Sequence, residues 1–270
     1  VNLKGDLQSG FKMAEILKRS QIIASRAIRP FNIPVQGRVA FSGKVKAELD
    51  SVLETLKVEG RISGSALSYE QWSAEDLSAE GVWTASPKGG EIAITHAEII
   101  SKERKRVGGT QPGGGGKIEL GPVQYSLENP GPISVPLQLT DAHVHWLGAG
   151  ALKDVYPLNF KVSGPAEITF NPPTKATAWG VQTKLEFQIK DFQLDNQRLG
   201  KIKPLHKVLD IQGFELTGGL AVDPSGIKPV GLFLKLPNSQ LGVSGKIDFK
   251  TGYDLYASGP VSLSDFGEIA

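Results

Sequence analysis

Apolar and polar residues alternate with a period of two along most of the chain, and this pattern predicts β-strands. Leu185, Phe187 and Ile189 are separated by polar residues, and more than ten segments of the chain show the same spacing. Because successive side chains of a strand point to opposite faces, each segment places its apolar side chains on one face. Turn-forming runs such as Pro87–Gly90 separate the segments. We therefore expect a mainly β protein built from many antiparallel strands.

One segment near the N-terminus departs from this alternation and predicts an α-helix. Between Ser9 and Ile28 apolar residues recur at helical spacing, basic residues occupy the opposite face, and Pro30 stops the run. With Ser9 as the N-cap, the pattern predicts one long amphipathic helix over residues 9–28. We prefer packing on the sheet for this helix over a position on a membrane surface or against another protein. A short helix around Pro204–Leu209 is a second expectation.

A basic run followed by many glycines predicts a flexible loop over residues 102–116. Lys102–Arg106 lead into a stretch rich in glycine that ends at Gly116, and such sequences are costly to order. The stretch superficially resembles a phosphate-binding loop. However, Gln111 stands where that motif needs its first glycine, and Ile118 stands where it needs Ser or Thr. We reject a nucleotide site here.

Composition narrows the class of protein further. The chain has 270 residues, enough for one large core, and a formal charge of +2. This balance gives no support for nucleic acid as a partner. The chain has no cysteine, which excludes disulfides and thiolate metal sites and is compatible with a periplasmic location. Val1 already lies inside an alternating segment, so we expect the chain to be a fragment of a longer protein.

The segment Asp141–His145 is the strongest candidate for metal chemistry. On a strand, Asp141, His143 and His145 would share one face, which suits a divalent cation. The segment is similar to the first-strand HxH signature of amidohydrolases, but that site needs two further histidines, and only His206 follows. The helices of a (β/α)₈ barrel are also missing from the pattern. We interpret the histidines as structural, find no Ser–His–Asp arrangement, and predict no enzyme activity, metal site or cofactor.

Two pairs of segments resemble strands of a known superfamily. Ile33–Gly43 followed by Leu56–Gly64 is similar to its paired "GxVxxSG … VEGxIxG" strands. Gln240–Phe249 followed by Tyr253–Leu255 is similar to its "LxVxGxIDF…YDL" strands. On these segments the chain resembles the AsmA-like superfamily, and particularly its TamB (translocation and assembly module) group. The glycine-rich loop and Asp141–His145 depart from that pattern.

This resemblance implies an elongated, curled antiparallel sheet, half-open like a taco shell, with an apolar groove inside. It also implies a module of an inner-membrane-anchored periplasmic bridge that carries phospholipid toward the outer membrane and supports outer-membrane biogenesis. A role in assembling outer-membrane proteins with an Omp85-type partner stays open as an alternative. A structural β-solenoid, such as an adhesin domain, is another alternative, although no short regular repeat is present.

The expected groove lining consists of apolar residues that share one parity within their strands. These residues are Val39, Phe41, Val58, Ile62, Ile92, Ile94, Leu185, Phe187, Ile189, Leu232, Leu234, Val243, Ile247 and Phe249. In the competing interpretation the same residues meet one another in a closed core that has no room for an acyl chain.

Overall fold

The computed structural model of the chain describes twelve stretches of residues. These stretches are 2–8, 11–12, 34–48, 55–69, 72–86, 90–101, 115–126, 128, 131–143, 158–173, 178–195 and 207–266. They hold fifteen strands and a short 3₁₀ turn. The strands are β1 (Asn2–Gln8), β2 (Phe11–Lys12), β3 (Pro34–Lys46), β4 (Lys57–Tyr69), β5 (Trp72–Thr84), β6 (Glu91–Ser101), β7 (Gly116–Leu120), β8 (Val123–Ser126), β9 (Ile133–His143), β10 (Leu158–Asn171), β11 (Gly180–Asp195), β12 (Lys207–Asp223), β13 (Gly226–Lys235), β14 (Gln240–Asp248) and β15 (Gly252–Ser258), and the turn η5 is Leu263–Phe266.

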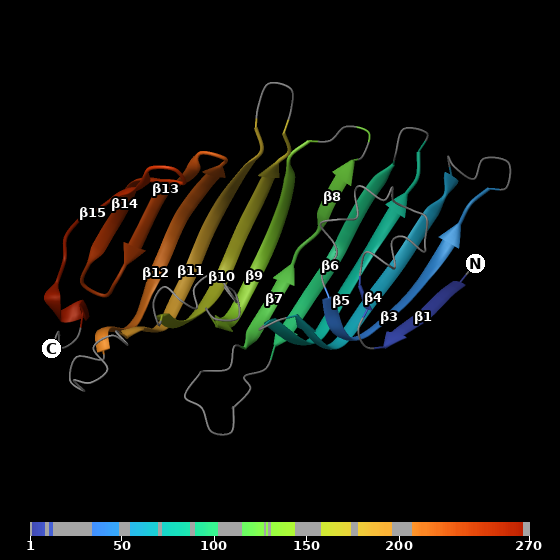
Figure 1. Cartoon of the computed structure of the whole chain (residues 1–270), viewed down its shortest axis with the longest axis horizontal. Coiled ribbons are helices and arrows are strands. Elements are labelled where there is room, and N and C mark those ends of the chain that lie inside the picture. Colours follow the sequence, from blue (N-terminus) through green and yellow to red (C-terminus); the bar gives the residue numbers. More distant parts are fainter. Residues whose placement is uncertain are drawn as a thin grey trace.

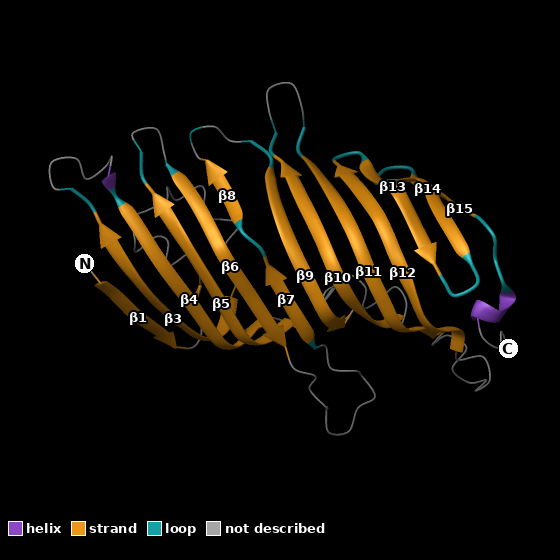
Figure 2. Ribbon diagram, turned by 180° about the vertical axis from the view of Figure 1, so that it is seen from behind, coloured by secondary structure: helices purple, strands orange, loops and turns teal. Residues whose placement is uncertain are grey.

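The strands form one antiparallel sheet that does not close on itself. Its order is β1-β3-β4-β5-β6-β7-β9-β10-β11-β12-β13-β14-β15, while β2 pairs with β3 and β8 pairs with β6. Neighbours in the sheet are therefore almost always neighbours in the sequence. Figure 1 shows the strands as a single row in chain order, with β1 and β15 at opposite ends. Figure 2 shows the same arrangement from behind. The expectation of a mainly β, antiparallel sheet is confirmed.

Bulges bend the strands and help to curl the sheet. The pairing of β9 with β10 shifts register between Val162 and Gly164, next to Asp141, whose backbone has a φ of 45°. Similar shifts occur in the β5–β6 and β12–β13 pairs. Because an extra residue on one strand increases local twist and bends it, a sheet with several bulges curls instead of lying flat.

The predicted N-terminal helix is not supported. Phe11 and Lys12, which fall inside its predicted range, form β2 and pair with Val35 and Pro34. Pairing with a neighbouring strand overrides the weak local preference for a helix. The remainder of that range, residues 13–28, lies outside the described residues. In the part of the chain that is described, no helix is long and apolar enough to cross a membrane.

The short helix expected around Pro204–Leu209 is wrong in its second half. Residues 207–209 begin β12, where Leu209 pairs with Leu194 of β11. Residues 204–206 lie outside the described ranges. β12 contains adjacent glycines at 218 and 219 and a register shift at the same place, which interrupt its alternation and obscure the strand in the sequence.

The buried hydrophobic cluster of the described residues lies where β9, β10 and β11 are adjacent. Leu139, Ala142, Val162 and Ile189 form a buried cluster. Partly buried side chains pack against it, including Phe192, whose ring lies 5.5 Å from that of Phe160 and 5.6 Å from that of Phe214. Burial of this kind contributes about 25 cal/mol per Å² of apolar surface. The cluster therefore anchors the middle of the sheet.

Candidate functional site

Apolar side chains occupy one face of the sheet from strand to strand, and we call this the apolar face. Its central row is set by direct pairing across ten strands, and every member is apolar or glycine. The row is Gly5, Phe41, Ile62, Ala79, Ala97, Leu120, Leu137, Ala166, Leu185 and Gly218. Because residues directly opposite one another in an antiparallel pair point to the same face, the row is continuous.

Two shorter rows extend the apolar face toward the end of the strands where the β12–β13 and β14–β15 turns lie. We call this the upper end, and the end where the β13–β14 turn lies is the lower end. The first of these rows is Val45, Val58, Trp83, Ile92 and Tyr125. The second is Phe170, Val181, Val222, Ile227, Ile247 and Tyr253. Each row is set by direct pairing between neighbouring strands.

Most residues predicted to line a groove lie in strands and share the apolar face. This holds for Val39, Val58, Ile62, Ile92, Ile94, Leu185, Phe187, Ile189, Leu232, Leu234, Val243 and Ile247. Phe41 pairs with Ile62 through its backbone, and the placement of its side chain is outside the description. Phe249 differs, because it lies in the turn after β14 and is 56% exposed.

Burial of the apolar face changes from the lower to the upper end. Val162 and Ile189, toward the lower end, are each 4% exposed. Toward the upper end, Ile92 is 38% exposed, Phe170 is 36% exposed and Tyr253 is 84% exposed. The apolar face is therefore packed tightly below and open to solvent above.

The opposite face of the sheet carries charged side chains that pair across strands, and we call it the polar face. Arg61 lies 3.3 Å from Glu80 on the neighbouring strand. Lys117 contacts Glu98 at 3.0 Å and Glu119 at 2.9 Å. Hydrogen bonds to Glu119 and then to Glu98 raise the pKa of Lys117 above its usual value. Such exposed pairs add little stability, but they keep this face hydrated.

The polar face also bears a shallow depression of about 370 Å³ over β3 to β6. It is lined by small side chains, among them Ala40, Ser63 and Ser78, and by the charged Arg38 and Asp76. The depression lies on the side of the sheet away from the apolar rows. It contains none of the residues expected to line a groove.

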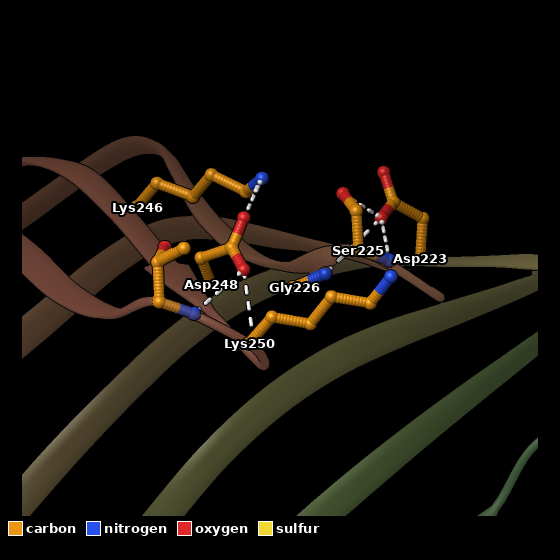
Figure 3. A network of polar contacts seen from close by, with 7 residues as sticks. Asp223, Ser225, Gly226, Lys246, Asp248 and Lys250 are labelled. Carbon is orange, nitrogen blue, oxygen red and sulfur yellow. Dashed lines mark hydrogen bonds and ion pairs between the residues drawn. The ribbon is translucent and has the colours of Figure 1, made fainter.

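Two aspartates brace the turns at the upper end, as Figure 3 shows. Asp248 accepts hydrogen bonds from Lys246 Nζ at 2.7 Å, from the Lys250 backbone N–H at 2.9 Å and from that of Thr251. The bond to Lys246, followed by the two backbone bonds, lowers the pKa of Asp248 well below its usual value. The β14–β15 turn is therefore held in one conformation.

Asp223 does the same for the β12–β13 turn. Its carboxylate accepts hydrogen bonds from the Ser225 hydroxyl and from the backbone N–H groups of Ser225 and Gly226. These bonds, that of the Ser225 hydroxyl first, lower the pKa of Asp223. The Phe249 N–H donates to the Ser225 carbonyl at 3.2 Å. The two turns are thereby joined, next to the exposed Phe249.

The candidate metal residues do not form a common site in the part that is described. Asp141 is exposed, and its N–H donates to Ser163 Oγ at 2.9 Å while that hydroxyl donates to its carboxylate. His143 is buried, and its N–H donates to the Gly115 carbonyl at 2.8 Å. His145 lies outside the described residues. Among those that are described, no group of three His, Cys, Asp or Glu side chains could hold a metal ion.

The same contacts bear on the glycine-rich segment. Gly115 and Gly116, at the end of the loop predicted over 102–116, are packed against β9. Gly116 already belongs to β7. The remainder of the predicted loop, residues 102–114, lies outside the description.

The sequence pattern missed part of the apolar face. β5 contributes Leu77, Ala79 and Trp83, although its sequence shows no clear alternation of apolar and polar residues. Small alanines and interspersed glycine weaken its alternation, so only the pairing with β4 and β6 makes the strand evident. Leu137 and Leu139 of β9 also lie on the apolar face, although they are not among the residues expected to line a groove.

Comparison with known proteins identified no relative of this chain. No family model, curated protein or solved structure matches the chain.

Proposed function

We propose that the chain binds the acyl chains of phospholipids along its apolar face. In this proposal the curled sheet is a half-open groove, and the chain is a module of a periplasmic bridge of the AsmA-like, TamB type. It carries phospholipid between the inner and outer membranes and thereby supports outer-membrane biogenesis. It acts by shielding acyl chains from water, without a cofactor and without catalysis.

The observation that supports this most strongly is the uninterrupted central row. From Phe41 to Leu185 no charged or polar side chain interrupts it over eight paired strands. The sheet has thirteen strands along its path, and twelve spacings of about 4.8 Å give a surface roughly 60 Å long. A surface of this length accommodates several acyl chains side by side.

Transfer energetics favour such a guest. Each CH₂ group removed from water contributes about 0.8 kcal/mol. Surfaces of soluble proteins rarely expose contiguous apolar patches of more than a few hundred Å², and larger patches mark binding sites. The half-exposed residues at the upper end, such as Ile92 and Phe170, fit this rule because a bound acyl chain would cover them.

The burial gradient suggests how a lipid is oriented. The tightly packed cluster around Val162 and Ile189 leaves little exposed surface at the lower end, whereas the upper end is open. We place the head groups at the open upper end, where they stay hydrated, and the acyl chains across the central row. The polar face, with pairs such as Arg61–Glu80, then faces the aqueous periplasm.

The proposed setting follows from the sequence resemblance. We place the chain in the periplasm, as part of a protein anchored in the inner membrane through a segment elsewhere. An Omp85-type protein of the outer membrane is the partner that the resemblance suggests. These statements depend on the motif segments Ile33–Gly43 and Gln240–Phe249 together with the open, one-sided sheet.

The test is site-specific photo-crosslinking with lipid. A photo-reactive residue is placed at Phe187 or Ile247 on the apolar face, and at Gln188 or Lys246 on the polar face of the same strands. The purified chain is incubated with vesicles of phosphatidylethanolamine and phosphatidylglycerol, irradiated, and analysed by mass spectrometry. We expect lipid adducts from positions 187 and 247 and none from 188 and 246.

Two results would contradict the proposal. Adducts of equal yield from both faces would indicate nonspecific contact with vesicles. No adduct from either apolar position, with the fold intact by circular dichroism, would mean that the apolar residues serve only to hold the sheet together.

A further inference from the structure

The outer edge of β15 is left without a partner strand in the described part of the chain. β15 (Gly252–Ser258) pairs with β14 through seven consecutive residues and no register shift. All seven are exposed. The strand contains no Lys, Arg or Pro, although natural edge strands commonly use these residues or bulges to prevent pairing with another chain. This edge is thus a regular row of backbone donors and acceptors.

Exposed apolar side chains gather around the same edge. Among the described residues, eight of the thirteen exposed large hydrophobic side chains lie between Val230 and Leu263. On β15 itself, Tyr253 and Leu255 extend from the apolar face, and Tyr256 extends from the polar face. Because exposed large side chains lie on both faces of this edge strand, a docked strand would bury side chains on each side as well as its backbone.

We propose that β15 pairs with β15 of a second copy of this chain, antiparallel and around a two-fold axis at Leu255. The two sheets then join edge to edge, and their apolar faces stay on the same side because the axis is perpendicular to the sheet. This dimer extends the apolar face across both copies. Its formation does not depend on lipid binding.

The sequence of β15 is complementary to itself in this arrangement. Leu255 lies opposite Leu255 of the second copy, Tyr253 lies opposite the small Ala257, and Asp254 lies opposite Tyr256. No like charges meet, the two leucines form an apolar pair, and the large Tyr253 faces the small Ala257, which are favourable cross-strand pairs. A hydrogen bond to Asp254 of the same strand raises the pKa of the Tyr256 phenol, so this side chain stays uncharged opposite Asp254 of the second copy.

Strand direction favours this pairing over a head-to-tail one. β1 and β15 run in the same direction, because an even number of antiparallel steps separates them along the sheet. Placing β1 of another copy beside β15 with the apolar faces aligned would therefore create a parallel pair. All pairs in the described sheet are antiparallel, and only the two-fold arrangement continues that pattern.

A charge-swap experiment tests the proposal. The oligomeric state of the full chain is measured by sedimentation at increasing concentration, with Leu255→Lys and Leu255→Glu variants alone and mixed. We expect the unmodified chain to reach twice its 28.9 kDa mass. Each variant alone should dissociate at least about tenfold more readily, because like charges then face each other across the axis. The equimolar mixture should regain the dimer, because Lys then faces Glu.

The control is Leu263→Lys, which places the same charge at an exposed site beyond the strand and should leave the dimer intact. Hydrogen exchange gives a second readout, in which the β15 amides become protected as the concentration of the unmodified chain rises. A chain that stays monomeric, a dimer that survives Leu255→Lys, or a mixture that stays dissociated would each overturn the proposal. Lipid crosslinking at Phe187 is read separately, so failure of the dimer and failure of lipid binding are distinguishable.

Discussion

Gly116 and Ala142 lie backbone against backbone where β7 begins and β9 ends. A β-carbon on Gly116 would overlap the Ala142 α-carbon and lie 2.8 Å from its nitrogen, and Gly116 has a φ of +128°. We predict that Gly116→Ala destabilises the fold by about 2–4 kcal/mol, because both steric overlap and backbone strain oppose it. Urea unfolding followed by circular dichroism measures this.

The matched control for this substitution is Gly231→Ala. Gly231 also has a positive φ, of +56°, but a β-carbon there would meet nothing within 4 Å. We expect Gly231→Ala to lower the free energy of unfolding by about 1–2 kcal/mol, because only the backbone conformation opposes it. If the two substitutions lower the free energy of unfolding by the same amount, the close packing of Gly116 on β9 does not contribute to stability.

Charged substitutions distinguish an open apolar face from a closed core. Val162→Asp places a carboxylate in the buried cluster, and we expect a loss of about 4 kcal/mol or more. Ile247→Asp lies in the upper row, where the carboxylate reaches water, and should cost under about 2 kcal/mol. Phe187→Asp, packed against the cluster, should fall between them. If urea titrations show the same loss of unfolding free energy at all three positions, the whole apolar face is buried in a closed core.

Acid stability should depend on the carboxylates that brace the turns. Burial acts to raise the pKa of Asp265, but hydrogen bonds from Ser239 and Asn238 outweigh it and lower the pKa below 3.8. A carboxyl with a lowered pKa in the folded state stabilises the fold above pH 3.8, and this contribution is lost as the pH falls toward the folded value. Asp265→Asn should therefore lower the urea midpoint at pH 7 and have a smaller effect at pH 3.

Asp76→Asn is the control for this pH dependence. The Asp76 carboxylate is exposed and makes no hydrogen bond or ion pair with the described residues, so its substitution should shift the midpoint little at either pH. A loss at Asp265→Asn that is the same at pH 7 and pH 3 would show that the lost hydrogen-bond acceptor matters and the negative charge does not.

We predict that protein purified without an affinity tag contains no stoichiometric zinc, manganese or iron. Asp141 is exposed and bonded to Ser163, whereas His143 is buried beside Gly115. The two side chains thus lie in different environments, Asp141 within the bulge of β9 and His143 beyond it. Elemental analysis checks this, and a bound ion that is lost in His143→Ala would contradict it.

Local alternation was sufficient to predict the sheet and much of the apolar face. Phe187 and Ile189 share a parity in the sequence, and they share a face in the structure because the period of a strand is two. Phe249 shares the parity of Ile247 but not its position, because the turn braced by Asp248 begins after residue 248. Parity predicts a face only as far as the strand continues.

The sequence by itself determined the class of fold, since pattern, turns and composition all act over a few residues. Only the tertiary structure decided which residues lie opposite one another on neighbouring strands, as Ile62 pairs with Ala79 and Leu137 with Ala166. It also decided that Phe11 and Lys12 pair as a strand, although their local pattern favours a helix. The depth gradient from Val162 to Tyr253 depends on bulges and on neighbours distant in sequence. Strand pairing and burial depend on residues far apart in the sequence, so local residue patterns do not predict them.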